Sequence, residues 1–254
     1  MSNIRLIPVL LSDGPESLVK TTKFKNPIYL GDPVNAVKIF NEKEVDELIF
    51  LDINASKLGR KPSLDYIREF AGECFMPVAY GGGLSTIQEV KEVLNAGVEK
   101  VVLNNAALNN LKIVSETADK YGSSATVVAI DVVKDFWGNY KVYQHTSGKH
   151  RNLNPVDYAL AAEKAGAGEI FLNNVDREGT MNGFDNKLIK LLIDAVGIPV
   201  IASGGAGKLE DIREAAQTGV RAFGCGSLFA FKGVHRAVLI SYPSQEEIKT
   251  ILKI

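Results

Sequence analysis

The sequence carries Pro77-Val78-Ala79-Tyr80-Gly81-Gly82-Gly83 and, 122 residues later, the matching stretch Pro199-Val200-Ile201-Ala202-Ser203-Gly204-Gly205. The same offset relates further pairs, namely Gly97-Val98 with Gly219-Val220 and Glu47 with Glu169. Residues 47–106 and 169–228 are therefore two copies of one segment. A repeat of this length indicates that each half of the chain is one structural unit, and it points to equivalent functional positions in both halves.

Short apolar runs alternate along the chain with segments of helical periodicity. The runs predict eight strands, at Arg5–Leu10, Leu48–Ile53, Pro77–Gly81, Lys100–Asn104, Thr126–Asp131, Glu169–Asn173, Pro199–Ser203 and Ala222–Gly226. The periodic segments predict helices at Val34–Val45, Leu64–Cys74, Thr86–Ala96, Leu111–Tyr121, Val156–Ala165, Asn186–Val196 and Leu209–Gln217, with a further pair near the C-terminus. Several strands are continuously apolar, as strands buried on both faces are.

Eight strand–helix units with an internal repeat predict a (β/α)8 TIM barrel made of two half-barrels, and we take residues 1–254 as a single domain. A doubly wound open sheet also alternates strands with helices, but it gives no reason for one offset across half the chain. Two segments break the rhythm. Residues 11–32 are expected to form a long loop after the first strand. Within residues 132–153, Trp137-Gly138-Asn139-Tyr140 predicts a hairpin turn between short strands.

Composition excludes several classes of function. A net charge of −1 favours neither nucleic acid nor an acidic membrane as a partner. The two cysteines, Cys74 and Cys225, suggest neither a disulfide framework nor a zinc cluster, and they fit a reducing cytosol. No apolar run approaches the length of a membrane span. The first residues lack the basic and apolar regions of a signal peptide, so we expect a cytoplasmic location.

The carboxyl ends of the predicted strands repeat a glycine-rich pattern, and chemistry in such barrels lies at these ends. Glycine lets backbone N–H groups approach an anion closely, and a following helix N-terminus adds its dipole. We therefore predict one phosphate cradle in each half of the barrel. The first consists of Gly82, Gly83, Asn104 and Asn105, and the second of Gly204, Gly205, Gly226 and Ser227, with Gly179 and Thr180 as further candidates. The alternative is that these glycines only relieve tight turns.

Asp131 is the candidate general acid or base, because it follows the apolar run Val127-Val128-Ala129-Ile130 at the predicted mouth of the barrel. The alternative is a helix cap or turn residue. Asp52, at the end of the second strand, is another candidate. Asp176 and Glu178 lie in an exposed loop after the sixth strand.

The first loop carries Lys20 and Lys23. Each of these lysine side chains either folds over a bound anion or stays solvated. The three histidines, His145, His150 and His235, show no ligand spacing and no partner acid. We therefore predict no metal and no cofactor, and the sequence contains no nucleophile motif.

Four strands begin with a charged residue beside an apolar run: Arg5, Glu47, Lys100 and Glu169. Two of these residues are basic and two are acidic. They therefore either close a neutral ring of ion pairs across the bottom of the barrel or remain four solvated strand-end charges, each contributing little.

The chain resembles the HisF family, the cyclase subunits of imidazole glycerol phosphate synthase, over nearly its whole length. The matching motifs are Gly31-Asp32-Pro33, Asp46-Glu47-Leu48-Ile49-Phe50-Leu51-Asp52-Ile53-Asn54-Ala55-Ser56, Gly81-Gly82-Gly83, Val128-Ala129-Ile130-Asp131, Gly166-Ala167-Gly168-Glu169-Ile170, Asp176-Arg177-Glu178-Gly179-Thr180 and Ile201-Ala202-Ser203-Gly204-Gly205-Ala206-Gly207-Lys208. The resemblance implies two phosphate sites and a glutaminase, HisH, docked at the N-terminal face of the barrel. Ammonia from the glutaminase then crosses the barrel to the mouth. There it cleaves a phosphorylated ribulosyl-formimino nucleotide, and an imidazole ring closes.

The resemblance gives the four strand-start charges a role. Arg5, Glu47, Lys100 and Glu169 match the salt-bridged gate through which ammonia enters in this family. All four residues are present. A HisH-like glutaminase partner and ammonia channelling are therefore expected here.

The resemblance also exposes a departure at the mouth. The family uses two aspartates as its acid/base pair, and the second matches Asp131. The first belongs to a Cys-Leu-Asp-Val pattern, which here reads Val9-Leu10-Leu11-Ser12, so that Leu11 replaces the aspartate and cannot transfer a proton. Ser12 points to the other side of the strand. Further departures are Pro15-Glu16-Ser17 in a lengthened first loop, Asn173-Asn174 in the sixth strand and Glu178 in place of an aspartate.

This pattern resembles HisF-like second copies found with surface-polysaccharide genes. These work with a HisH-like glutaminase and a sugar amidotransferase, which forms an acetamidino group on a nucleotide-linked sugar. The first hypothesis is therefore an ammonia-delivering synthase subunit for sugar amidination, with a phosphorylated small molecule as ligand. The alternatives are a histidine-pathway cyclase, a catalytically silent scaffold that conducts ammonia, and a HisA-like isomerase, which has no need of the bottom gate.

Overall fold

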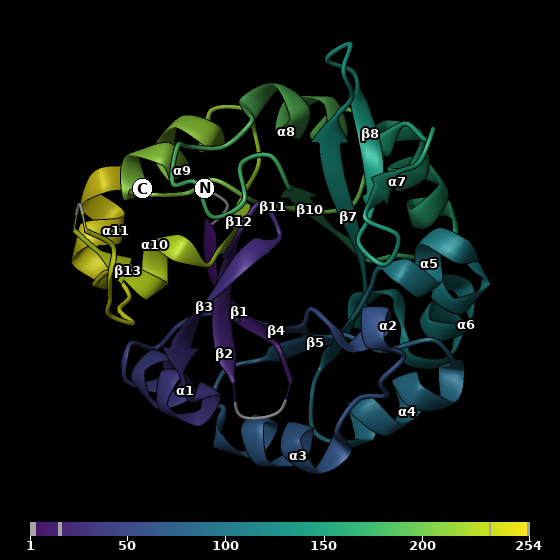
Figure 1. The fold of residues 1–254 in the computed structure, drawn as a ribbon, viewed down its shortest axis with the longest axis horizontal. Helices are drawn as coiled ribbons and strands as arrows, with labels where there is room; N and C mark the ends of the chain where they lie inside the picture. Colours follow the sequence, from purple (N-terminus) through teal and green to yellow (C-terminus); the bar gives the residue numbers. More distant parts are fainter. Residues whose placement is uncertain (1–3, 15–16, 234, 253–254) are drawn as a thin grey trace.

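The computed structural model describes residues 4–14, 17–233 and 235–252, and within them eight parallel strands close into a barrel (Figure 1). Around the barrel the strands are β1 (Arg5–Ser12), β4 (Leu48–Asp52), β5 (Val78–Gly81), β6 (Lys100–Leu103), β7 (Thr126–Lys134), β10 (Glu169–Asn174), β11 (Val200–Ser203) and β12 (Ala222–Cys225). Parallel pairing of β12 with β1 closes the ring, and Arg5 lies opposite Ala222. The predicted TIM barrel is confirmed, with each strand near its expected place.

Helices surround the strands on the outside (Figure 1). They are α1 (Pro33–Glu42), α3 (Leu64–Glu73), α4 (Ile87–Asn95), α6 (Lys112–Tyr121), α7 (Pro155–Lys164), α8 (Asn186–Ile193), α9 (Leu209–Ala216) and α11 (Gln245–Leu252). Shorter segments are α2 (Ala55–Leu58), α5 (Asn105–Asn109), the 3-10 turn η1 (Ser123–Ala125) and α10 (Ser227–Ala230). Asp32 caps α1 by accepting a hydrogen bond from the Asn35 amide at 3.0 Å, with Pro33 in the first turn.

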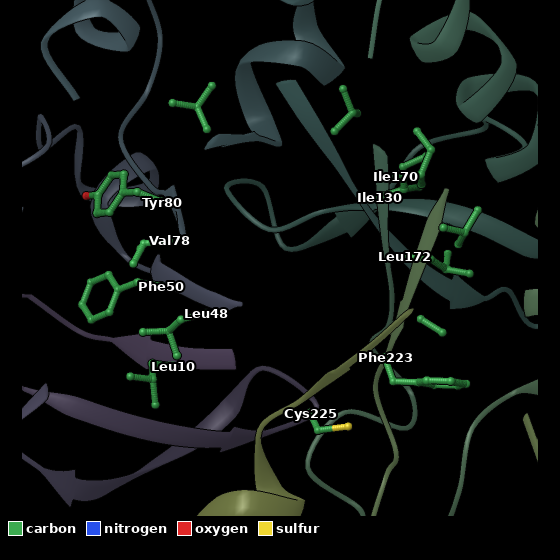
Figure 2. Close-up of a cluster of buried hydrophobic side chains, with 14 of the residues drawn as sticks. Leu10, Leu48, Phe50, Val78, Tyr80, Ile130, Ile170, Leu172, Phe223 and Cys225 are labelled. Atoms are coloured by element: carbon green, nitrogen blue, oxygen red, sulfur yellow. The ribbon is translucent and has the colours of Figure 1, made fainter. Parts of the chain in front are cut away.

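Strand alternation divides the apolar side chains into two layers. Side chains that point outward from the strands pack against the helices, among them Leu10, Phe50, Leu172 and Phe223 (Figure 2). The alternate side chains of these strands point into the barrel. Together with Val19, which lies outside the eight barrel strands, they form a separate cluster: Ile7, Val9, Leu11, Ile49, Ala79, Val102, Val127, Ala129, Phe171, Ile201 and Ala222. The interior of the barrel is therefore a packed apolar core beneath its mouth.

The prediction of a loop over residues 11–32 is wrong. β1 extends to Ser12, and β2 (Leu18–Thr22) and β3 (Lys25–Gly31) form an antiparallel hairpin that pairs with it. The hairpin turns at Lys23 and Phe24, whose φ angles of 53° and 60° fall in the left-handed region. Two-residue turns of this kind usually contain Asn or Gly, which are missing here. Pro15 and Glu16, predicted to lengthen this segment, lie outside the described residues.

The predicted hairpin after the fifth barrel strand is confirmed. β7 continues past Asp131 to Lys134 and pairs with β8 (Tyr140–Gln144), which pairs in turn with β9 (Lys149–His150). The sequence predicts Asp131 at the end of this strand. In the structure Asp131 lies within β7, which continues for three more residues. β13 (Phe231–Lys232) and β14 (Ala237–Val238) form a small hairpin near the C-terminus.

Candidate active site

A cavity of about 480 Å³ opens at the carboxyl ends of the barrel strands. Its floor is apolar and includes Leu11, Ala129 and Phe171 from the interior of the barrel. Its walls include nearly all the residues predicted to bind phosphate or transfer protons: Gly82, Gly83, Asn104, Asn105, Asp131, Gly179, Gly204, Gly205, Gly226 and Ser227. The volume suits a small-molecule ligand.

Asp131 lies in the cavity wall with only 8% of its surface exposed. Its two carboxyl oxygens accept hydrogen bonds from Asn104 Nδ2 at 3.0 Å and Asn173 Nδ2 at 3.2 Å. Burial raises the pKa of the Asp131 carboxyl to about 7, against the lowering effect of the two amides and with a smaller contribution from the Glu178 charge. A carboxyl group with this pKa can both donate and accept a proton near neutral pH.

Leu11 occupies the inner face of β1 at the mouth and contacts the apolar floor. The neighbouring polar residues, Ser12 and Asp13, do not supply the carboxyl group that the family has at this position. Ser12 is buried and its hydroxyl oxygen accepts a hydrogen bond from the Gly14 amide at 3.1 Å. Asp13 is exposed and accepts a hydrogen bond from Asn54 Nδ2. The β1 side of the mouth therefore carries an aliphatic side chain.

The predicted cradle glycines have a steric role in both halves of the barrel. A Cβ on Gly82 would lie 2.5 Å from the Asp52 carbonyl oxygen, and one on Gly204 would lie 2.5 Å from the Asn174 carbonyl oxygen. A Cβ on Gly83 or Gly205 would also meet a backbone oxygen, at 2.5 and 2.1 Å respectively, and all four glycines have positive φ. Relief of tight packing therefore accounts for these glycines, and all four residues border the cavity.

The polar side chains of the two cradles differ in how they are engaged. Asn104 donates to Asp131, and Asn105 Oδ1 accepts hydrogen bonds from Thr146 Oγ1 at 2.8 Å and Gln144 Nε2 at 3.1 Å. The Asn104 amide nitrogen is therefore already engaged within the protein, and phosphate binding by the two asparagines stays a prediction. By contrast, the buried Ser227 hydroxyl has no hydrogen-bond partner among the described residues. An anion at the second cradle would provide one.

Thr180 and Gly179 hold the loop after β10 in place. The Thr180 hydroxyl donates to the Arg177 carbonyl at 2.7 Å, so it is engaged within its own turn. A Cβ on Gly179 would lie 2.2 Å from the Thr21 carbonyl oxygen, because this loop packs tightly against the β2–β3 hairpin. Of the two, Gly179 borders the cavity.

Glu178 fastens the β2–β3 hairpin over the mouth. Its carboxylate forms a buried ion pair with Lys20 and accepts hydrogen bonds from Thr21 Oγ1 and the Phe24 amide, both at 3.1 Å. Lys20 is thus neither solvated nor free for an anion in this state, whereas Lys23 is exposed.

The two remaining acidic candidates serve local structure. Asp52 caps the turn into α2 through the Ala55 amide at 3.0 Å and pairs with Arg60 at 3.2 Å, and burial raises its pKa. Asp176 accepts a hydrogen bond from the Lys134 amide at 2.9 Å. Asp52 also borders the cavity.

His145 also lines the cavity, although its position in the sequence did not predict this. Its ring packs edge-on against Phe24 with 5.3 Å between ring centroids. Burial, followed by the Lys57 charge, lowers the pKa of the imidazole, and the Ile53 backbone opposes this shift. Burial and the Lys57 charge both favour the neutral form of the imidazole. No spacing in the sequence signals this position, because the β8–β9 turn carries the ring across the mouth.

Four charged side chains close the opposite end of the barrel. Arg5 bonds Glu47 at 2.9 Å and Glu169 at 2.6 Å, and Lys100 bonds the same two carboxylates at 2.8 and 3.1 Å. Both glutamates are buried. Of the two alternatives for these residues, the ring of ion pairs is therefore confirmed. The barrel has a charged constriction at its amino end, an apolar interior and a polar cavity at its carboxyl end.

Metal-binding clusters and membrane spans are both missing from residues 4–14, 17–233 and 235–252. These residues contain no group of three or more His, Cys, Asp or Glu side chains arranged to hold a metal ion. No helix in the same part of the chain is long and apolar enough to cross a membrane.

Comparison with known proteins gives consistent matches along the chain. The family model described as histidine biosynthesis protein matches residues 5–235. A Pseudomonas aeruginosa protein provisionally named imidazole glycerol phosphate synthase subunit hisF2 is 50% identical over 245 residues, covering 96% of this chain and 97% of the relative. A provisionally named HisF subunit from Leptospira interrogans is 43% identical, with 96% of each chain covered. The Pyrococcus furiosus imidazole glycerol phosphate synthase subunit HisF is 42% identical over 89% of this chain and 90% of its own.

Proposed function

Because this chain belongs to the histidine biosynthesis protein family, in its HisF branch, we propose that it is a synthase subunit that receives ammonia through its barrel from a HisH-like glutaminase. The ammonia serves to amidinate a nucleotide-linked sugar in surface polysaccharide biosynthesis. The observation that carries the proposal is a contrast between the two ends of the barrel. The ion-pair ring is complete, whereas Leu11 faces the mouth where the family has its first catalytic aspartate.

The ring has the properties required of an ammonia gate. Each carboxylate is bound by both cations, so the ring is neutral and closed. Ammonia is small and uncharged, and the apolar interior above the ring does not oppose its passage. Lys100 is the more mobile cation by chemistry, since a flexible ammonium is less rigidly held than a planar guanidinium. A glutaminase docked around this end would deliver ammonia directly into the barrel.

The mouth has one of the two acid/base groups of the family reaction. Asp131 is present with a pKa suited to proton transfer, but Leu11 cannot exchange a proton with it. The buried Ser227 hydroxyl and the glycine-lined walls support a phosphorylated ligand. The Pseudomonas aeruginosa relative carries a numbered name, hisF2, which supports placement among second copies.

A second candidate is a genuine cyclase of histidine biosynthesis. The intact Asp131 site and the size of the cavity favour it. A third, a silent conducting scaffold, retains the ring but does not use Asp131. The first and third differ in whether Asp131→Asn changes the yield of the sugar product.

A direct assay separates amidination from cyclisation. The purified protein is supplied with ammonium and the phosphorylated ribulosyl nucleotide, and imidazole formation is followed. The proposal expects no turnover above background. Leu11→Asp is the informative variant, because it returns a carboxyl group opposite Asp131. Robust cyclisation by the unmodified protein would overturn the proposal in favour of the cyclase.

A reconstitution tests whether the subunit delivers ammonia for sugar amidination. The protein is combined with a HisH-like glutaminase, glutamine, and a sugar amidotransferase with its nucleotide-sugar substrate. Acetamidino-sugar should form from glutamine only when all three proteins are present. Formation of the product without the barrel subunit would refute its role in delivery.

A further inference from the structure

Large apolar side chains are exposed unevenly over the described surface. Most of them lie on segments that follow the carboxyl ends of barrel strands, namely Ile28, Tyr29, Leu58, Phe136, Trp137, Val238 and Leu239. At the amino ends the corresponding residue is Phe75, and Leu160 and Leu191 lie on the outer helices. Scattered exposed residues need no explanation, but two large aromatic side chains exposed together on one turn, Phe136 and Trp137, indicate a binding surface.

Phe136 and Trp137 are the most exposed of the mouth-side residues, at 92% and 82%. Their rings pack edge to face with 5.4 Å between centroids. Figure 1 shows the β7–β8 hairpin that carries them projecting beyond the ring of helices. Aromatic pairs that remain this exposed contribute little to the stability of their own chain, whereas buried in a partner they are frequent anchors of interfaces.

The turn presents these two side chains in a fixed arrangement. Asp135 Oδ1 accepts hydrogen bonds from the Trp137 amide at 2.9 Å and the Asn139 amide at 2.8 Å. The Asp135 amide donates to the Asn139 carbonyl at 2.9 Å, which closes the turn. A preformed anchor loses little conformational freedom on binding, so the tip is suited to docking.

We propose that the mouth-side face of the barrel docks a second protein, the enzyme that consumes the ammonia, with Phe136 and Trp137 as its anchor. The proposal rests on the proposed function. β7 carries Asp131 in the cavity wall and leads directly into the β7–β8 turn that holds the aromatic tip. At about 3.3 Å per residue, Phe136 and Trp137 lie within roughly 20 Å of Asp131. A protein that grips the tip therefore also reaches the rim of the cavity.

Surface charge indicates the chemistry of the docked protein. Exposed lysines surround the mouth, including Lys23, Lys25, Lys57 and Lys134. Within the described part of the chain no ion pair involves Lys23, Lys25 or Lys57, although the chain as a whole has a net charge of −1. The complementary surface is an apolar cleft with acidic side chains around it.

The consumer of ammonia fits this position for a chemical reason. Ammonia that escapes into water at neutral pH is protonated and loses its nucleophilic electron pair. A protein seated over the mouth would take up ammonia before this happens, and the mouth is the end of the barrel away from the ion-pair ring. The residues that would touch such a protein are the exposed apolar ones of this face.

The test compares two matched surface variants. The double variant Phe136→Ser/Trp137→Ser removes the anchor, and Phe75→Ser removes an exposed aromatic side chain at the other end of the barrel. Affinity for the purified sugar amidotransferase is measured by titration, together with glutamine-driven product formation. The double variant should bind the amidotransferase at least about tenfold more weakly, as expected for loss of an aromatic anchor, and Phe75→Ser should bind it as the unmodified protein does. Both variants should retain the unfolding midpoint of the unmodified protein.

Trp137 is the only tryptophan of the chain and provides a direct readout. In protein labelled with 5-fluorotryptophan, its single fluorine resonance should shift when the amidotransferase is added. Unchanged affinity of the double variant, while the unmodified protein binds the amidotransferase and delivers ammonia to it, would overturn the docking proposal alone. If the unmodified protein neither binds nor supplies the amidotransferase, the proposed function fails with it.

Three further measurements on the same variants distinguish other occupants. A tip-dependent dimer in analytical ultracentrifugation would make the occupant a second copy of this chain. Tip-dependent flotation with vesicles of phosphatidylglycerol and phosphatidylcholine in equal parts would make it a membrane surface, and tip-dependent binding of single-stranded oligonucleotide would make it a nucleic acid. Each of these results would overturn the proposal.

Discussion

At the scale of single residues, Asp131 links the chemistry of the mouth to the stability of the fold. Burial raises the pKa of this carboxyl from 3.8 to about 7. A carboxyl group whose pKa is higher in the folded than in the unfolded chain favours folding while it is protonated. That contribution is complete below the unfolded pKa and is lost as the pH rises through about 7.

Asp131→Asn should remove this pH dependence. The difference in unfolding free energy, unmodified protein minus variant, should fall between about pH 4 and pH 7 and then level off, by at most about 4 kcal/mol in total. Urea unfolding of both proteins across this range measures it. Asp65→Asn, which changes an exposed carboxylate on α3, is the control and should show no such trend. A constant difference for Asp131→Asn would mean that its carboxyl has an ordinary pKa.

Lys100 tests the ring of ion pairs. Lys100→Glu would place three carboxylates against the single cation of Arg5 and should lower the unfolding free energy by about 3 kcal/mol. Product formation from glutamine should be lost, whereas formation from added ammonium should persist because the mouth is unchanged. Lys91→Glu, an exposed lysine on α4, serves as the control. Glutamine-driven product formation by a folded Lys100→Glu protein would show that ammonia enters elsewhere.

Sequence patterns located the residues of the cavity more readily than the hydrogen bonds that these residues form. The glycines and asparagines at strand ends border the cavity, while phosphate binding by them stays a prediction. The patterns did not predict that Asn104 is held by Asp131, since a hydrogen bond between neighbouring strands depends on side-chain geometry that no spacing encodes. His145 was missed for the same reason, because only the course of the β8–β9 turn brings it to the mouth.

At the scale of elements, the β2–β3 hairpin depends on one buried ion pair. Glu178→Gln would leave the Lys20 ammonium buried without its carboxylate. We expect faster amide hydrogen exchange in residues 18–31, by about tenfold or more, with little change in the outer helices. Glu210→Gln, at an exposed position on α9, is the matched control. Unchanged exchange in the hairpin would show that its strand pairing, not Glu178, holds it over the mouth.

The hairpin also shows where local sequence rules stop. Lys23 and Phe24 take up left-handed backbone conformations that favour Asn and Gly, so the turn is not visible in the sequence. Pairing with β1 and the contacts of Glu178 stabilise it instead. In contrast, Trp137-Gly138-Asn139-Tyr140 carries an ordinary turn signal, and the hairpin predicted there is confirmed.

At the scale of the whole molecule, the repeat predicts that equivalent glycines in the two halves are packed equally tightly. A Cβ on Gly82 or on Gly204 would meet a backbone carbonyl at the same distance, 2.5 Å. Gly82→Ala and Gly204→Ala should therefore destabilise the protein by similar amounts, about 3 kcal/mol or more, as measured by chemical unfolding. Gly31→Ala isolates the backbone strain, because Gly31 has φ +127° and no atom near its Cβ position, and about 1 kcal/mol is expected there. Very different costs for Gly82 and Gly204 would argue against equivalent packing in the two halves.

The barrel itself was predictable because its evidence is distributed over the chain. Continuous apolar runs, helical periodicity and the offset of 122 residues all indicate the same architecture, so an error in one element does not change it. The side chains at the mouth have no such redundancy. Leu11 is one residue in one strand, yet it separates two proposed functions.

The ring at the amino end has a consequence for the unassembled subunit. With Arg5 and Lys100 each bound to two carboxylates, a copy without a glutaminase is shut at its base while its mouth stays open. Solutes that enter through the mouth therefore meet a closed end, and the ring must open before the cavity communicates with the amino end.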